Sequence, residues 1–197
     1  FYDTYGATEL GTVTNLNLSK NLSKKKTLGA AIKNVDIKIL DKKNKEIKEK
    51  NKKGSIACKS KLAFSYYLKS NLKNKNTFHG YFKTGDIGFI DNDGMLQLTG
   101  REKEIIIIGG VNVFPQDIER VLDSYSVVKK SVVIGLKDKR LGEGILAFII
   151  LRKKKIFNLL EIKKFCVKNL SDYQQPHKFI IVKKFPLGGY GKISKFK

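Results

Sequence analysis

A hairpin signal near the middle of the chain constrains the fold most. Two β-prone runs, IGFID at 87–91 and MLQLT at 95–99, flank Asn92, Asp93 and Gly94. The Asp-Gly pair supplies the positive backbone dihedral angles that a tight turn needs. The sequence therefore predicts an antiparallel hairpin at this point.

Two more strands are expected before the hairpin. Residues 35–40, VDIKIL, alternate between apolar and charged side chains, which predicts a strand with one solvated face. GSIACKS at 54–60 predicts a second strand. The Lys-rich segment 41–54 between them is interpreted as an exposed turn rather than a binding patch, and the polar segment 69–80 as a surface excursion.

Strands and helices mix beyond the hairpin. Pro115 suits the first turn of a helix, and Ile118, Val121 and Leu122 then share one face. Further strands are expected at 105–108, 131–136, 144–151 and 179–185, and a second helix at 159–170 with Leu159, Ile162, Phe165, Cys166 and Leu170 on one face. REKE at 101–104 is a short charged connector that suits a hinge. We therefore expect an α+β fold: a β-rich part over 1–102 and a compact α+β domain over 103–197.

Composition limits the classes of function. Of the 197 residues 41% are hydrophobic, which is enough for a packed core, and the formal net charge is +22. This charge suits polyanionic partners such as nucleic acid or an anionic membrane. However, the excess is almost all Lys, whereas phosphate recognition favours Arg, and the aromatic residues do not interleave with the basic runs. A compositional bias is therefore favoured over nucleic-acid binding, which stays the alternative outside the enzymes.

Structural metal sites and membrane spans are not expected. Cys58, Cys166, His79 and His177 have no metal-binding or redox spacing. No apolar run reaches the ~18 to 20 residues that cross a bilayer. The longest run, at 145–151, predicts a buried strand. Cytoplasmic localisation is the expectation, with peripheral membrane contact left open.

Several short constellations could carry chemistry. YGATE, from Tyr5 to Glu9, combines a ring that can stack on a base, a hydroxyl and a carboxylate that can hold a hard cation. Asp86 follows Gly85 on an expected turn, where a carboxylate can accept two hydrogen bonds from a diol. Arg101 follows Gly100 and offers forked donors. Taken singly, a capped turn or a surface ion pair is the favoured explanation of each motif, with Gly85-Asp86 as the exception.

Two glycine motifs complete the set. Gly109 and Gly110 would let a thin ligand pass close to the backbone. Lys192 follows the glycine-rich stretch PLGGYG at 186–191, which could carry its ammonium group into a remote site.

The order of these motifs resembles a known superfamily. YGATE, then YFKTGDIGFIDNDGMLQLTGREKEIIIIGGVNVFPQDIERVL at 81–122, then KDKRLGE and PLGGYGKISK, resemble the C-terminal part of adenylate-forming (AMP-binding) enzymes. The resemblance covers nearly the whole chain and is nearest to fatty-acyl-CoA synthetases, the long-chain-fatty-acid–CoA ligases. It implies an enzyme that uses ATP and magnesium to activate a carboxylic acid as acyl-AMP and then transfers the acyl group to CoA.

The resemblance also implies roles in the nucleotide site. Tyr5 would lie against adenine, and Gly6 and Ala7 would line the acyl end of the pocket. Thr8 would contact the α-phosphate and Glu9 the magnesium ion.

The other implied roles concern the ribose, the thiol and the hinge. Asp86, assisted by Arg101, would hold the ribose hydroxyls, and Lys192 would serve adenylate formation. Gly109 and Gly110 would lie beside the pantetheine of CoA. Lys103 would be the hinge about which the C-terminal domain swings.

The chain also departs from the family pattern. The phosphate-binding loop rich in Ser, Thr and Gly is not in this sequence, so the chain is expected to be an inactive fragment of a longer enzyme. Lys103 stands where Asp is common, and the tail GGYGK has Gly where a hydroxyl residue is common. An adenylation domain or an acyl-AMP ligase that loads a carrier protein is the alternative among the enzymes.

Overall fold

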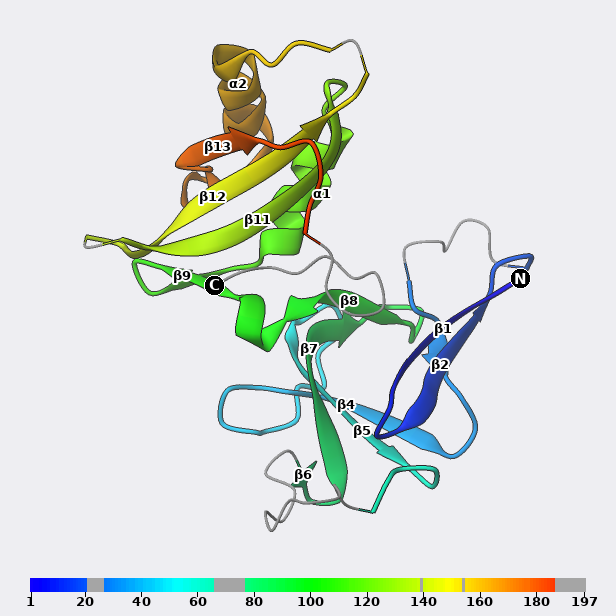
Figure 1. The fold of residues 1–197 in the computed structure, drawn as a ribbon. Helices are drawn as coiled ribbons and strands as arrows, with labels where there is room; N and C mark the ends of the chain where they lie inside the picture. The colour runs from blue at the N-terminus through cyan, green and yellow to red at the C-terminus, as the bar shows by residue number, and fades with distance from the viewer. Residues whose placement is uncertain (21–26, 66–76, 139, 154, 187–197) are drawn as a thin grey trace. The chain divides into compact units, whose positions relative to one another are not determined.

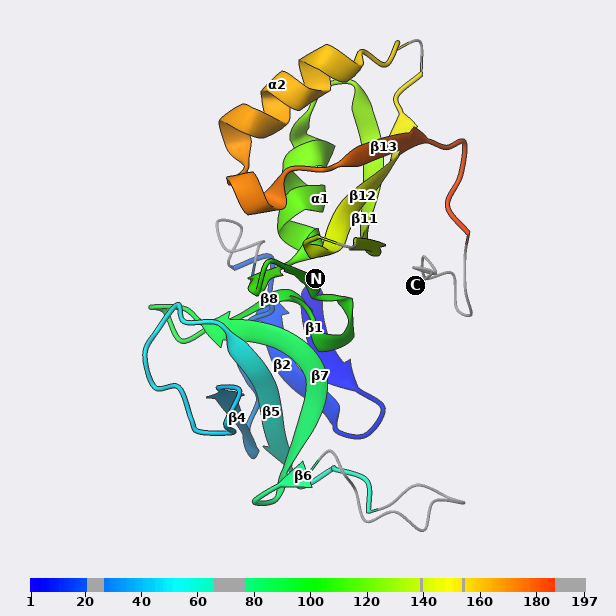
Figure 2. The same ribbon diagram turned by 90° about the vertical axis from the view of Figure 1, so that its left-hand side faces the viewer.

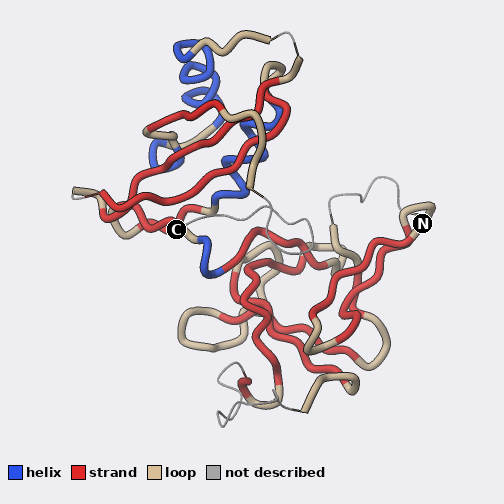
Figure 3. The backbone as a smooth tube through the Cα atoms, in the orientation of Figure 1, coloured by secondary structure: helices blue, strands red, loops and turns tan. Residues whose placement is uncertain are grey.

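The computed structural model describes residues 1–20, 27–65, 77–138, 140–153 and 155–186. It divides the chain into two compact units, Phe1–Lys103 and Glu104–Lys197, which we call unit 1 and unit 2. The boundary expected from the charged connector lies one residue earlier. Both sheets and helices are present, and the mixed α+β class expected from the sequence is confirmed (Figure 3).

Unit 1 is built from strands in two sheets (Figures 1 and 2). The first sheet has the order β1-β2-β3, with strands Tyr2–Ala7, Gly11–Asn17 and Ala30–Ala31. The second has the order β4-β5-β7-β6, and β8 also pairs with β7; its strands are Val35–Leu40, Gly54–Ser60, Thr77–Phe78 (β6), Tyr81–Ile90 (β7) and Leu96–Arg101 (β8). All described pairs in these two sheets are antiparallel.

The predicted hairpin is present as β7 and β8. Asp91 stabilises its turn, because one carboxylate oxygen accepts from the backbone N–H groups of Asp93 and Met95. Gly94 has a φ of 78°, which a residue with a side chain rarely adopts. The strands β4 and β5 also begin and end at the residues expected from the alternating pattern.

One local expectation was wrong. Asp86 was placed on a turn because Gly85 precedes it, but β7 begins at Tyr81 and Asp86 lies inside the strand. Gly85 has a φ of 76°, so it kinks the strand without ending it. The Asp86 N–H donates to the Thr84 hydroxyl at 3.1 Å. Asp86 is therefore held by the sheet rather than by a flexible loop.

A single core joins the two sheets of unit 1. Its buried members come from β2 and the turn before it, and from β4, β5, β7 and β8: Leu10, Val13, Ile39, Ile56, Cys58, Phe82 and Leu96. Leu10, Val13, Ile56, Cys58 and Leu96 have no measurable exposure. The strands of the first sheet, which the sequence patterns did not predict, are thus fixed by burial against the second.

The described part of unit 2 is a five-stranded sheet with two α-helices. The sheet order is β10-β9-β12-β11, and β13 pairs with β12 in parallel. The elements are β9 (Ile106–Ile108), β10 (Val111–Val113), α1 (Pro115–Ser124), β11 (Val128–Asp138), β12 (Gly142–Leu151), α2 (Leu159–Asn169) and β13 (Lys178–Ile181). Two 3₁₀ helices complete the described chain, at Glu102–Glu104 and Asp172–Gln174. The last strand ends four residues before the expected end at 185.

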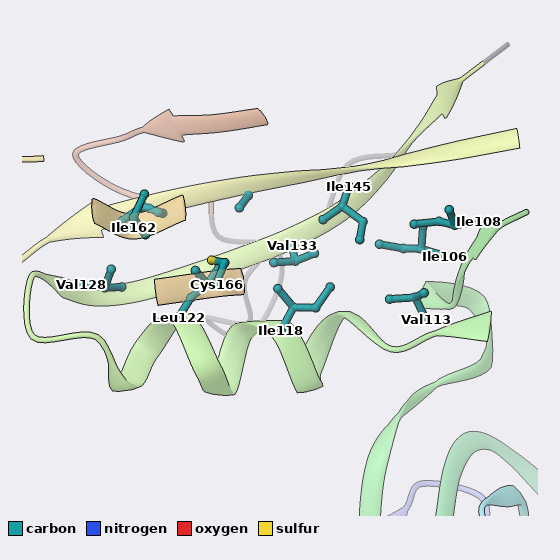
Figure 4. Packing of buried hydrophobic residues seen from close by; sticks show 12 residues of the cluster. Ile106, Ile108, Val113, Ile118, Leu122, Val128, Val133, Ile145, Ile162 and Cys166 are labelled. Carbon is teal, nitrogen blue, oxygen red and sulfur yellow. The ribbon is translucent and has the colours of Figure 1, made fainter. Parts of the chain in front are cut away.

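The two helices of unit 2 begin as their sequences indicate. Pro115 stands at the start of α1, where its missing N–H costs nothing. Asn158 caps α2, because its side-chain oxygen accepts from the N–H groups of Leu160 and Glu161. Ile118 and Leu122 of α1 and Ile162 and Cys166 of α2 then enter one buried cluster with the sheet (Figure 4).

The predicted apolar face of α2 is only partly buried. Ile162 and Cys166 are about 1% exposed, whereas Leu159 is 45% exposed. Two other apolar residues, Leu160 and Val167, are each 71% exposed.

In the described residues, no helix has the length and apolarity needed to cross a bilayer.

The two buried thiols predict how stability changes at alkaline pH. Burial raises the pKa of Cys58 from 9.0 to about 12, with the nearby Asp86 and Asp36 charges adding to it, and burial raises the pKa of Cys166 from 9.0 to about 11. Above pH 9 the unfolded chain therefore releases protons that the folded chain keeps. The free energy of unfolding should fall as pH rises from 9 toward 11, by up to about 1.4 kcal/mol per pH unit for each thiol.

Urea unfolding of wild type and of the variants Cys58→Ala and Cys166→Ala measures this effect. Each substitution should flatten the dependence on pH between 9 and 11, even if it lowers stability at neutral pH. Native thiols should also react slowly with a thiol reagent at pH 8. Fast labelling of both thiols in the folded chain would contradict their burial.

Candidate functional site

Three predicted site residues meet in unit 1. The hydroxyl of Tyr5 donates to Asp86 Oδ2 at 2.7 Å, although the two residues are 81 positions apart. Arg101 Nε lies 3.1 Å from Asp86 Oδ1. Asp86 and Arg101 are also directly opposite each other in the β7–β8 register. The sheet therefore brings the isolated acid, the isolated guanidinium and the aromatic ring together.

The three side chains differ in burial. Asp86 is 6% exposed, whereas the side chain of Arg101 is 63% exposed. Each oxygen of Asp86 already has one partner, and a carboxylate offers roughly four lone-pair directions. Arg101 has further N–H donors on its exposed guanidinium. A hydroxyl-bearing ligand could thus bond the carboxylate edge and Arg101 at the same time.

Contacts within the sheet fix the backbone on both sides of Asp86. Thr84 donates its hydroxyl to the Ile56 carbonyl at 3.1 Å and accepts from the Asp86 N–H. Gly88, two residues further along β7, has no room for a side chain, because a Cβ there would lie 2.3 Å from the Gln97 carbonyl oxygen. The position of the carboxylate is therefore set by rigid strands, which suits a site that must be organised before its ligand arrives.

Burial controls protonation around this cluster. It raises the pKa of Tyr5 well above the usual range, and the Asp86 carboxylate raises it further. Tyr5 thus stays protonated and keeps donating to Asp86. The buried Cys58 thiol is a neighbour of the cluster that the sequence did not indicate, since nothing in its own segment links it to Asp86.

The rest of YGATE spans the end of β1 and the start of the β1–β2 turn. Gly6 must be glycine because a Cβ would lie 2.3 Å from the Gly11 carbonyl oxygen. Ala7 ends β1 and accepts the Leu10 N–H at 3.0 Å. Thr8 is exposed and Glu9 half-buried. The structure places both on the turn that follows the strand carrying Tyr5.

Glu9 is the residue that the resemblance assigns to magnesium. Among the described residues, no group of three or more His, Cys, Asp or Glu side chains could bind a metal. Mg²⁺ commonly uses one or two carboxylates together with substrate phosphates. A single carboxylate such as Glu9 would fit that pattern where phosphates supplied the remaining oxygen ligands, and this role stays a prediction.

Gly109 and Gly110 form the turn between β9 and β10 in unit 2. Their φ angles are 54° and 82°, and an added Cβ on either would meet nothing within 4 Å. Glycine is thus required by the backbone conformation, and the surrounding space is open. The expected position beside a thin ligand stays a prediction.

Glu143 holds this turn and was not predicted from the sequence. Its carboxylate accepts from the Ile107 N–H at 2.6 Å, one strand position from the turn. The Gly109 N–H donates to the Leu141 carbonyl at 2.9 Å. One contact comes from Leu141, just before β12, and the other from Glu143 near the start of β12, so the KDKRLGE segment supports the β9–β10 turn. The sequence could not predict the hydrogen bond between Glu143 and Ile107, because the two residues are 36 positions apart and meet only in the folded sheet.

Two predicted site residues, Lys103 and Lys192, lie outside the clusters described above. Lys103 lies in the 3₁₀ helix Glu102–Glu104 and is the last residue of unit 1. Its role as a hinge stays a prediction. Lys192 and the glycines before it lie outside the described residues.

Both the sequence and the fold of this chain are similar to those of known proteins. The family described as "AMP-binding enzyme C-terminal domain" matches residues 117–192. Residues 117–192 are therefore similar to the C-terminal domain of AMP-binding enzymes. The matched range covers most of unit 2 and includes Lys192.

Relatives extend the similarity across both units. The mitochondrial medium-chain acyl-CoA ligase ACSF2 of Bos taurus is 30% identical over 98% of the chain, and the 2-succinylbenzoate–CoA ligase of Enterococcus faecalis is 33% identical over 98%. The chain spans only 32% and 39% of these two proteins. The solved Bacillus subtilis o-succinylbenzoate CoA synthetase, bound to its acyl-adenylate OSB-AMP, has a TM-score of 0.86 at 28% identity. That structure is matched over 98% of this chain and 39% of its own.

The Asp86 cluster predicts an asymmetric response to mutation. Asp86→Ala removes the acceptor of the buried Tyr5 hydroxyl and should lower the free energy of unfolding by about 1–3 kcal/mol. Arg101→Gln is the matched control at the other end of the ion pair. Because the Arg101 side chain is mostly exposed, this substitution should lower the free energy of unfolding by only about 0–1 kcal/mol. Equal losses in urea unfolding would show that the ion pair, rather than the buried carboxylate, stabilises the cluster.

Proposed function

We propose that the chain is the C-terminal part of an AMP-forming acid–CoA ligase. A substrate carboxylate would attack the α-phosphorus of ATP, releasing pyrophosphate and leaving an acyl-adenylate. The CoA thiolate would then attack the acyl carbon and release AMP. The observation that carries this proposal is the preformed cluster of Tyr5, Asp86 and Arg101 in unit 1.

The cluster would recognise the ribose of the nucleotide. The Asp86 carboxylate would accept hydrogen bonds from the ribose hydroxyls, and Arg101 would donate to a hydroxyl oxygen. Tyr5 would keep the carboxylate oriented through its hydroxyl while its ring faces the base. Rigid strands on both sides of the site favour this role, since little ordering is left for the ligand to induce.

The β1–β2 turn would face the phosphates. Thr8 would donate its hydroxyl to the α-phosphate, and Glu9 would bind magnesium together with phosphate oxygens. A solved form of the Bacillus subtilis enzyme holds ATP and a magnesium ion, which supports the same ligands here. Lys192 would place a cation beside the α-phosphate, where charge shifts during the attack.

Unit 2 would serve the thiol step. Gly109 and Gly110 would lie beside pantetheine, because their missing side chains leave room at the turn. We propose a fatty acid as the acyl substrate and CoA as the acceptor. The named relatives include a medium-chain acyl-CoA ligase and a 2-succinylbenzoate–CoA ligase, so medium-chain and aromatic acids belong in the substrate panel.

Pyrophosphate exchange by the full-length protein tests the first step. With ATP, magnesium and a panel of fatty and aromatic acids, the wild type should exchange labelled pyrophosphate into ATP. Lys192→Ala should reduce exchange by about 100-fold or more. Asp86→Ala should mainly raise the KM for ATP. Normal adenylate formation by Lys192→Ala would refute the role of Lys192, and the absence of exchange with every acid would refute the ligase assignment.

Glu143 should affect the second step alone. Glu143→Ala removes the acceptor of the Ile107 N–H and loosens the Gly109–Gly110 turn, so acyl transfer to CoA should slow by about tenfold or more. Pyrophosphate exchange should be unchanged. Glu143→Gln keeps an oxygen acceptor and should restore most of the transfer rate. Equal effects of Glu143→Ala on both half-reactions would contradict this positioning role.

A further inference from the structure

Helix α2 has apolar side chains on two opposite sides. Ile162 and Cys166 are buried in the core of unit 2. Leu160 and Val167 are each 71% exposed, which is far from the core. They are seven residues apart, so they lie nearly in line about two turns from each other along the helix. A helix that only covers its own sheet needs no second apolar line.

The exposed apolar line continues into the segment before α2. Ile156 is 87% exposed and precedes the capping residue Asn158. In Figure 2 this segment reaches α2 at the helix end that begins at Leu159, on the outside of unit 2. Three large aliphatic side chains, two on α2 and one in the segment before it, thus lie in solvent, and burying them against a partner would be favourable.

Lysines border this line on both sides. Lys163 and Lys164 fall between Leu160 and Val167 in the sequence, and successive residues are turned by about 100° around a helix. They therefore flank the line, and Lys168 follows it. All three are exposed. We call the set Ile156, Leu160, Lys163, Lys164, Val167 and Lys168 the outer face of α2.

Helix α2 carries little negative charge, and its acidic side chain already has a hydrogen-bond partner. Glu161 is its one acidic residue, and its carboxylate accepts from the Tyr125 hydroxyl at 3.4 Å. Basic charge continues before the helix, where Lys153 and Lys155 are exposed. The outer face thus combines apolar side chains with an excess of positive charge.

We propose that the outer face of α2 binds the surface of an anionic phospholipid membrane. Ile156, Leu160 and Val167 would enter the boundary between headgroups and acyl chains, and the lysines would contact anionic headgroups. Lysines that border exposed aliphatic side chains can lay their stems along the apolar surface and keep their charges at the level of the headgroups. Attraction of these charges to anionic lipids adds to the burial of the aliphatic side chains. At 11 residues α2 is about 16 Å long, so it would lie along the surface.

A membrane fits these residues better than nucleic acid does. Exposed aliphatic side chains gain nothing from a phosphate backbone, whereas a membrane removes them from water. Lys also suits diffuse attraction to many headgroups, whereas Arg suits bidentate recognition of single phosphates. This inference stands independently of the proposed ligase activity.

Vesicle flotation of the full chain tests the proposal. The chain should float with vesicles of phosphatidylcholine and phosphatidylglycerol but not with phosphatidylcholine alone, and binding should weaken with salt. Leu160→Asn with Val167→Asn should weaken binding about tenfold or more. Lys163→Gln with Lys164→Gln should weaken it about fivefold per lysine.

Matched controls separate this face from the general basic charge. Leu62 is 74% exposed in unit 1, so Leu62→Asn makes the same kind of change elsewhere. Lys42→Gln with Lys43→Gln removes equal charge from the exposed 41–54 turn. Both controls should bind like wild type, and circular dichroism should confirm that all variants fold.

Three outcomes would overturn the proposal. The first is vesicle binding that the α2 variants leave unchanged. The second is a loss in the controls equal to that in the α2 variants. The third is binding to polyuridylate with no binding to anionic vesicles, which would identify the lysines as a nucleic-acid surface instead.

Discussion

Antiparallel pairing of β7 with β8 is the interaction on which unit 1 and its candidate site depend. This pairing sets Asp86 opposite Arg101, and β7 also pairs with β5 and β6. A buried carboxylate is costly unless it has partners, and here Tyr5 and Arg101 each bond one of its oxygens. The same pairing that closes the sheet therefore also orients the group proposed to bind ribose.

The two units divide the chemistry of the proposed reaction. Unit 1 carries the ribose cluster and the β1–β2 turn with Thr8 and Glu9, and unit 2 carries the Gly109–Gly110 turn with its Glu143 support. Each unit has its own buried core, so each can keep its geometry while their relation changes. Lys103 ends unit 1 within a short charged connector, a suitable place for backbone angles to change.

What the many lysines indicate about function depends on where in the fold they lie. In the 41–54 turn the lysines extend from an exposed loop, and Lys38 and Lys52 pair with Glu46 and Glu49. Surface pairs of this kind add little stability and indicate no ligand. On α2 the same residue type borders exposed aliphatic side chains, and this combination supports a partner. Composition alone could not distinguish the two situations.

Local patterns determined much of this protein from the sequence. The Asp-Gly turn, the alternation at 35–40 and Pro115 predicted their elements, because hairpin turns, one-sided strands and helix starts depend on near neighbours. The order of motifs also indicated the resemblance to adenylate-forming enzymes. Only the tertiary structure decided which residues meet. The Tyr5–Asp86 hydrogen bond spans 81 positions and the Glu143–Ile107 bond spans 36. Such contacts follow from strand order and register, which pairing between distant segments sets. For the same reason, only the fold showed that Asp86 is buried within a strand and that Leu160 and Val167 point away from the core.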